Sequence, residues 1–379
     1  MFTINNVFWG IATIGTTFFL HIFFVTVVLG LSVIIPIFEI IGYIRKDEKF
    51  YRFARRLTSY LIRVDLFAGV LATWLTVFLA SYWPSLLYIA TNVLFYPISL
   101  ALGGIMVAIV SMALYWYTWD YMKRRTHIAV GLFMSAGALA VAFGMNSILA
   151  MMYCPYGVST TSSMGLTFFG SNGLDPLNNP IFLPLALYTW FISISLVSFI
   201  VLAFAIFRSK NDFTDEFQHT MRTSRALSLI FSFLSLATIV WTLLELRGYS
   251  QYVYHQMSAR GFVLISIVLA AVVALLSIIS LLEDAARYAA PAGAFLSYLL
   301  FMFFEVTSNT SRYPYLVVTN STGIPASSLV NPLFNIPDIL PIAGLLVMIG
   351  MLATFLFTLY LAFFVFPVDG RSKTATRTE

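Results

Sequence analysis

The sequence predicts an all-α polytopic membrane helix bundle of about nine transmembrane helices, with the N-terminus outside and the C-terminus in the cytoplasm. Composition is the first observation: 60% of the 379 residues are hydrophobic and only 10% are charged, whereas soluble domains carry about 25% charged residues. The second observation is the recurrence of apolar stretches long enough to cross a bilayer as a helix. These stretches are continuous rather than alternating, which excludes a membrane β-barrel.

Hydropathy places the helices in order within a single transmembrane domain that covers residues 1–379. The predicted spans are residues 7–44, 57–82, 90–118, 127–152, 181–207, 223–246, 261–282, 289–307 and 337–366. The N-terminus lacks the basic region and the small-residue cleavage site of a removable signal, so the first span is predicted to be retained.

The connections between the spans alternate sharply in charge. Seventeen of the 21 Lys and Arg residues fall in one alternate set of connections and in the C-terminal tail. The other set includes residues 153–180, which contain no Lys or Arg, and residues 308–338, which contain only Arg312. The positive-inside rule assigns the basic set to the cytoplasm. We expect the chain to be a multi-pass protein of the plasma membrane. The net charge of +5 is therefore a topology signal, and we expect the lipid bilayer rather than a nucleic acid as a partner.

Several classes of chemistry are excluded by missing motifs. Cys154 is the only cysteine, so the chain has no intrachain disulfide, and no Cys/His cluster has zinc spacing. The sequence contains no Walker loop, HExxH motif, nucleophile elbow or dinucleotide fingerprint. Soluble hydrolytic chemistry is therefore not expected.

Ionisable groups inside apolar spans are costly, so each one is a candidate functional residue. His21 lies well inside the first span, between phenylalanines. An imidazole at that depth suits an axial bond to haem iron, and the alternative is a histidine hydrogen-bonded to a neighbouring helix. His127 and His219 stand beside arginines at cytoplasmic ends and are predicted to be surface groups.

Three further candidates lie toward the cytoplasmic end. Glu39 follows His21 by 18 residues, or five helical turns, so both residues share one helix face. Glu39 is expected to be an interfacial anchor, a partner of Arg63, or a site of proton uptake. Arg63 and Asp65 open the second predicted span and are expected to pair across helices rather than with each other.

Candidates near the external ends are Glu245, Met257 and Glu305. Glu245 is a candidate for proton transfer or for an ion pair. Glu305 is expected to be either a second iron ligand or proton-exit group, or an interfacial carboxylate paired with Arg260 or Arg312. The Met257 thioether is able to ligate haem, although most methionines are packing residues.

In this arrangement the chain resembles subunit I of the cytochrome bd-type quinol oxidases. The strongest part of the resemblance is the first span, where His21, Leu29–Gly30 and Glu39 repeat the family pattern without a gap. The match continues with Trp83, Pro97, Trp119–Asp120, His127, Met152 and Pro155, and more loosely with Glu245–Tyr249, Met257, Gly261–Phe262 and Ser311–Tyr315.

The chain also departs from that family. No Asp or Glu occurs between Asp65 and Asp120, although the family carries two glutamates in the third span for proton delivery and for the oxygen-reducing haem. Residues 182–187 lack the low-spin haem histidine of the fifth span, which leaves Met257 without a partner ligand. The large quinol-binding loop of the family is reduced to about a dozen residues around 249–257.

The resemblance implies a subunit of a bd-type quinol:oxygen oxidoreductase complex of the respiratory chain, rather than an independently active enzyme. The chain would pair with a catalytic subunit-I paralogue, as in archaeal oxidases built from two subunit-I-like chains. His21 would ligate one b- or d-type haem, and quinol would bind to the partner subunit. The alternatives are a haem-free structural subunit of a respiratory complex and a secondary transporter.

Overall fold

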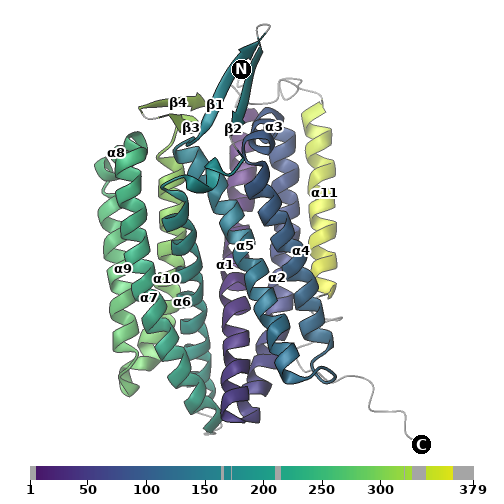
Figure 1. Ribbon diagram of the computed structural model, residues 1–379, viewed down its shortest axis with the longest axis vertical. Helices are drawn as coiled ribbons and strands as arrows, with labels where there is room; N and C mark the ends of the chain where they lie inside the picture. The colour runs from purple at the N-terminus through teal and green to yellow at the C-terminus, as the bar shows by residue number, and fades with distance from the viewer. Residues whose placement is uncertain are drawn as a thin grey trace, which may run out of the picture.

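The computed structural model describes residues 6–163, 166–171, 173–209, 215–319, 321–326 and 339–361. Long helices run up and down along one axis in this part of the chain, which confirms the all-α polytopic bundle (Figure 1). Eight helices among the described residues are long and apolar enough to cross a membrane. A helix closes its backbone hydrogen bonds internally, and this is why the bilayer selects helices for such apolar stretches.

The helices follow in chain order. They are α1 Asn6–Arg45, α2 Glu48–Tyr82, α3 Pro84–Val93, α4 Phe95–Tyr117, α5 Arg124–Tyr153, α6 Phe182–Ser209, α7 Asp215–Tyr249, α8 Gln251–Ala259, α9 Phe262–Ile279, α10 Glu283–Thr310 and α11 Ile339–Tyr360. A short 3₁₀ helix, Asp175–Asn178, precedes α6. The last helix, α11, lies within the predicted ninth span, whose remaining residues fall outside the described part of the chain. The number of nine spans therefore stays a prediction.

The third predicted span differs from the structure at its start. It was placed at 90–118, but the chain forms two helices there, α3 and α4, which meet at Leu94. Pro84 stands in the first turn of α3 and Pro97 in the first turn of α4, where a residue without an N–H group is tolerated. The apolar pattern is continuous across Leu94, so hydropathy alone does not predict this break.

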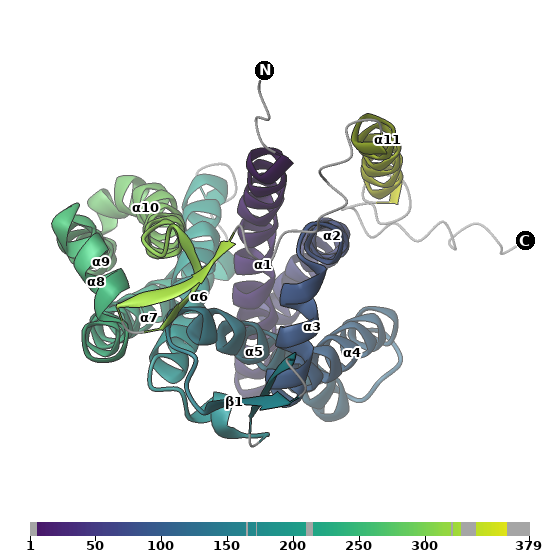
Figure 2. The ribbon, with the colours of Figure 1, turned by 90° about the horizontal axis from the view of Figure 1, so that it is seen from above.

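Two groups of four long helices make up the bundle. Viewed from above, α1, α2, α4 and α5 lie on one side and α6, α7, α9 and α10 on the other, with α1 and α5 next to α6 (Figure 2). The last helix, α11, stands apart and packs against α2, where the Trp74 indole donates a hydrogen bond to the Thr354 hydroxyl at 3.0 Å.

Small residues set the closest helix contacts. A Cβ atom added to Gly30 on α1 would lie 2.4 Å from the Ser193 carbonyl oxygen on α6. At the crossing of α4 and α5, a Cβ on Gly104 would lie 2.7 Å from the Gly137 carbonyl oxygen. Inside lipid the hydrophobic effect does not drive helices together, so close packing of this kind stabilises their association instead.

Two antiparallel hairpins cap one end of the bundle, beside α8 (Figure 1). Strand β1 (Val158–Ser163) pairs with β2 (Leu166–Ser171), and β3 (Tyr315–Thr319) pairs with β4 (Thr322–Pro325). Both hairpins belong to the connections that are almost free of Lys and Arg. These strands were not predicted, because β1 consists mostly of Ser and Thr and the apolar run of β3 is only a few residues long.

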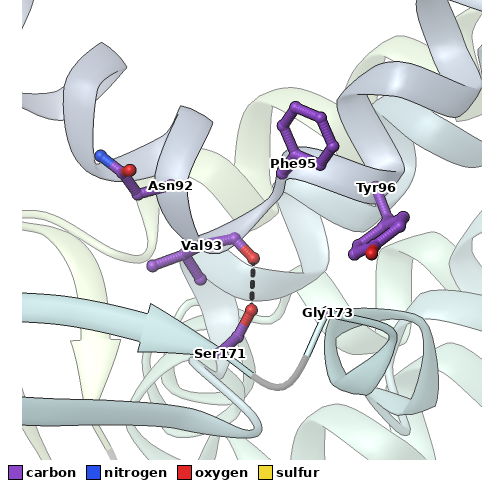
Figure 3. A pocket seen from close by; sticks show the side chains of 6 residues that line it. All are labelled: Asn92, Val93, Phe95, Tyr96, Ser171 and Gly173. Atoms are coloured by element: carbon purple, nitrogen blue, oxygen red, sulfur yellow. Dashed lines mark hydrogen bonds between the residues drawn. The ribbon is translucent and has the colours of Figure 1, made fainter.

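A pocket of about 370 Å³ lies where β2 meets the junction of α3 and α4 (Figure 3). The Ser171 hydroxyl donates a hydrogen bond of 2.7 Å to the Val93 carbonyl, and Tyr96 and Gly173 form another part of the lining. Among the described residues, no acidic or basic side chain and no predicted site residue lines this pocket. The hydrogen bond between Ser171 and Val93 joins the hairpin to the broken helix.

Candidate functional site

His21 lies on the side of α1 that faces α2. Its Nδ1 atom is 3.1 Å from the carbonyl oxygen of Ala68. A carbonyl only accepts hydrogen bonds, so Nδ1 carries the hydrogen and donates it. In the neutral ring, Nε2 then has a free lone pair, which is the tautomer that a metal-ligating histidine needs. This geometry fits both expectations for His21. The ring is hydrogen-bonded to a neighbouring helix, and its Nε2 atom is still able to ligate haem iron.

Arg63 and Asp65 lie deeper in the bundle than the sequence predicted. Because α2 begins at Glu48, these residues stand 15 and 17 positions into the helix rather than at its opening. Those positions correspond to about 22 and 26 Å along the helix axis. Asp65 is half-buried and precedes Ala68, the residue that anchors His21, by one helical turn. A carboxyl group therefore stands near the level of His21 in the membrane.

Glu39 is fully buried and bonds to two residues of the α4–α5 helix pair. Its Oε1 atom lies 2.7 Å from Nδ1 of His127, and its Oε2 atom accepts a hydrogen bond from the Tyr115 hydroxyl. The expected surface-anchor role of Glu39 is therefore wrong, whereas its pairing with Arg63 stays a prediction. The connection between α4 and α5 is short, so it brings Tyr115 and His127 to the same level as Glu39.

The surface position predicted for His127 is also wrong, since its side chain is 0% exposed. Its ring stacks on Tyr115 at a centroid distance of 4.1 Å and meets Trp119 edge-on at 4.5 Å. The neighbouring arginines stay near the surface, where Arg124 lies over the Tyr51 ring. The sequence signal for this burial was the aromatic run 8 to 12 residues before His127. A short turn between the two helices brings that run back against the histidine.

The hydrogen bonds of His127 fix one proton between two titratable groups. Its Nε2 atom lies 2.8 Å from the Tyr115 carbonyl oxygen and must donate to it. One further proton must then lie between Nδ1 and Glu39 Oε1. The pair is either an imidazolium with a carboxylate or a neutral imidazole with a carboxylic acid, and its total charge is zero in both states. This group can therefore hold a proton inside the membrane without a net buried charge.

Glu305 belongs to a second buried polar cluster, near the hairpin end. The Asn309 amide donates to Glu305 Oε2 at 3.3 Å, and the Arg312 guanidinium donates to Asn309 Oδ1 at 2.6 Å. Burial lowers the pKa of Arg312, and nearby Tyr153 and Glu305 partly oppose that effect. Glu305 is thus linked to Arg312 through Asn309, whereas Arg260 contacts Gln256 in its own helix. Glu305 makes no direct ion pair among the described residues, so both alternatives for Glu305 stay predictions.

Met257 and Glu245 lie in different surroundings. Met257, on α8, is 0% exposed and packs in an apolar cluster that also contains Tyr188 and Phe304. Glu245 is half-buried and accepts a hydrogen bond of 2.9 Å from the Trp241 indole in the same helix. Within the described residues, no hydrogen bond or ion pair joins His21, Met257 and Glu305, and their role as haem ligands stays a prediction.

The residues present fit a haem at His21 better than at Met257. At His21 the ring is oriented through Nδ1 and offers Nε2. At Met257 the thioether is enclosed, and α6, which contributes to the same cluster, contains no histidine along its length. Instead Tyr188 of α6 packs on Phe304 at 5.2 Å, and its hydroxyl has no hydrogen-bond partner in the described residues. A six-coordinate haem does not fit there.

The long apolar helices and their buried polar groups define a multi-pass protein of the plasma membrane. A family model described as "Cytochrome bd terminal oxidase subunit I" matches residues 12–244. This chain belongs to that family of cytochrome bd terminal oxidase subunits I. The matched range contains His21, Glu39 and His127 and ends before Met257 and Glu305.

Two similar proteins support this assignment. One is "Putative cytochrome bd menaquinol oxidase subunit I" of Bacillus subtilis (strain 168), which is 28% identical over 146 residues. That alignment covers 38% of this chain and only 32% of the relative's own length. The other is the structure of bd oxidase from Geobacillus thermodenitrificans, with a TM-score of 0.77 and 14% identity over 94% of this chain and 98% of that chain. At this identity the second likeness shows a shared fold.

Proposed function

We propose that this chain is a subunit of a bd-type quinol:oxygen oxidoreductase complex that pairs with a catalytic subunit-I paralogue and ligates one haem, of b or d type, through His21. The observation that carries the proposal is the His21 ring, which is anchored through Nδ1 on the Ala68 carbonyl and whose Nε2 has no hydrogen-bond partner among the described residues. The bound haem would supply electron transfer or oxygen chemistry, and the protein would supply its orientation.

The role of a partner subunit is supported by what the helices lack. No carboxylate occurs in α4, and no histidine occurs in α6. The connection between α7 and α9 is the nine-residue helix α8, which leaves little chain for a quinol-binding loop. Quinol oxidation is therefore assigned to the paralogue, and this chain provides the helix interface and one haem position.

The chain's own titratable groups extend this proposal. Glu39, which shares one proton with His127 of α5, lies on the helix that carries His21, about 27 Å along its axis. Asp65 stands one turn from Ala68, at the level of His21. Oxygen reduction consumes protons, so groups at these two levels support a role in supplying protons. Arg63 and Glu245 remain candidates for ion pairs in the same bundle.

Haem spectroscopy on the purified complex tests the proposal. We expect a reduced-minus-oxidised difference spectrum and a pyridine haemochrome assay to show one haem fewer in His21→Ala than in the wild type. The matched control is His255→Ala, which removes an exposed histidine on α8 and should leave the haem content unchanged. Full haem stoichiometry in His21→Ala would overturn the ligand assignment and favour the haem-free structural subunit.

The nature of the complex is tested by what co-purifies. We expect a second, haem-carrying subunit-I-like chain to accompany this one through affinity purification and size-exclusion chromatography. The absence of any haem-carrying partner would contradict the oxidase-subunit proposal. A secondary transporter is disfavoured by membership of the oxidase family, and it predicts no haem in the preparation.

A further inference from the structure

At the basic end of the bundle, α1 and α7 line a groove of about 320 Å³, which we call the basic groove. From α1 it is lined by Ile37, Ile41 and Arg45. From α7 it is lined mainly by His219, Arg222, Thr223, Ala226 and Leu227. None of these residues belongs to the candidate site described above, so the groove is a separate feature of the fold.

The two helices present the same gradient of polarity along the groove. On α1 the spacing of Ile37, Ile41 and Arg45 is four residues, which aligns them on one helix face with the charge at the end. On α7 the polar residues come first and Ala226 and Leu227 follow within two turns. Because α1 ends where α7 begins, both stripes are polar at the bundle end and apolar toward the membrane interior. A phospholipid has this same order of polarity.

The polar end of the groove concentrates positive charge. Arg45 and Arg222 are exposed, and Nη1 of Arg45 lies 3.4 Å from Nδ1 of the half-buried His219. No acidic side chain is among the described residues that line the groove. Arginine has only donors, so the Arg45 guanidinium donates the hydrogen bond to Nδ1 of His219. Arg45 and Arg222 both line the groove, and a phosphate accepts hydrogen bonds from several arginines at once.

The apolar end is open because α1 and α7 do not pack closely on one another. Each packs extensively on α6, and α6 thereby holds them apart. The Ile37 and Ile41 side chains are half-buried, and Ala226 is exposed, so a hydrocarbon chain has apolar surface on both sides. An inorganic anion would use the arginines and leave this apolar stripe without a role.

We infer that the basic groove binds an anionic phospholipid of the cytoplasmic leaflet, with the phosphate at Arg45 and Arg222 and an acyl chain along Ile41 and Leu227. Basic pockets between transmembrane helices on this side of a membrane are suited to such head groups. The inference depends on the orientation given by the positive-inside rule and does not depend on the haem proposal.

Native mass spectrometry of the delipidated complex tests this inference. The protein is titrated with phosphatidylglycerol, with phosphatidylcholine of the same acyl chains, and with inorganic phosphate alone. We expect one saturable phosphatidylglycerol adduct that neither phosphatidylcholine nor phosphate displaces. Arg45→Gln with Arg222→Gln should weaken it about 25-fold, or about 5-fold for each arginine. The control Arg56→Gln removes an exposed arginine at the same bundle end, outside the groove, and should not change it.

A second variant separates a lipid from a free anion. Ala226→Phe fills the apolar half of the groove and keeps both arginines, so it should abolish phosphatidylglycerol binding while any phosphate binding remains. Unchanged helical content by circular dichroism shows that each variant folds. Equal phosphatidylglycerol affinity in wild type and the double arginine variant would overturn the inference, as would equal binding of phosphatidylcholine or full displacement by inorganic phosphate.

Discussion

At the scale of single residues, Glu39 and His127 form a hydrogen-bonded pair inside an apolar bundle. Both side chains are 0% exposed, and each of their polar side-chain atoms has a hydrogen-bond partner. A buried pair of this kind costs desolvation energy that its mutual attraction roughly offsets. Removing one partner therefore lowers the free energy of unfolding much more than replacing both partners with apolar residues.

This leads to a prediction for the pair. His127→Ala leaves the Glu39 carboxyl buried without its partner and should lower the free energy of unfolding by about 3–5 kcal/mol. The double variant Glu39→Met with His127→Leu removes both groups and should lose less, because no titratable group remains unpaired. Denaturant unfolding of the purified protein in detergent measures both values. An equal or larger loss in the double variant would contradict this account.

The residue scale also shows which site residues were predictable. His21 was found from sequence because an imidazole inside an apolar span stands out against its neighbours. His127 was missed because adjacent arginines made it resemble an interfacial residue, and only the turn between α4 and α5 brings it beneath Tyr115 and Trp119. A charge pattern reports the depth of a segment but not the direction of one side chain.

At the scale of elements, glycines decide how closely the helices approach. Gly30 joins the two four-helix groups, since α1 meets α6 there at backbone contact distance. A second glycine of the same helix, Gly15, has no atom within 4 Å of an added Cβ. The two positions carry the same residue type in one helix, so they separate the effect of packing from the effect of helix propensity.

We therefore expect opposite results at these two positions. Gly30→Ala places a methyl group 2.4 Å from the Ser193 carbonyl oxygen and should destabilise the bundle by about 1–3 kcal/mol. Gly15→Ala meets open space and should be neutral, or stabilise α1 by up to about 1 kcal/mol. Thermal unfolding in the same detergent compares the two variants. A neutral Gly30→Ala would show that α1 and α6 do not approach as closely as described.

Element boundaries were predictable only in part. The apolar stretches located the long helices, but α2 begins nine residues before its predicted span and the third span is broken at Leu94. Hydropathy detects the part of a helix that lies in lipid, and it does not detect where the backbone stops being helical. Pro84 and Pro97, in the first turns of α3 and α4, indicate where these two helices begin.

At the scale of the whole molecule, the charges and the hairpins lie at opposite ends of the bundle. Both hairpins and α8 lie at one end, whereas the turns that follow α1 and α4 lie at the other (Figure 1). Arginines and lysines cluster in these two turns and in the helix ends beside them. The orientation across the membrane follows from the charge rule alone and remains a prediction.

Cysteine labelling tests this orientation. In a Cys154→Ser background, a cysteine at Thr322 should react with a membrane-impermeant maleimide added outside intact cells, whereas a cysteine at Tyr121 should react only after the cells are opened. Burial raises the pKa of Cys154 and so lowers its thiolate fraction near neutral pH, which makes the wild-type chain a low-reactivity reference. Labelling of both positions from one side would refute the topology.

The sequence by itself determined the class of fold and the family and singled out His21 as the candidate haem ligand, because bilayer length, loop charge and an isolated intramembrane histidine are properties of the linear chain. Haem ligation by His21 stays a prediction. The tertiary structure decided the partners: Ala68 for His21, His127 and Tyr115 for Glu39, and Asn309 between Glu305 and Arg312. Each of these contacts joins separate helices or a helix to the turn that follows it. Their geometry depends on how the helices rotate and cross, and glycine contacts such as the one at Gly30 set those crossings without a pattern that hydropathy can detect.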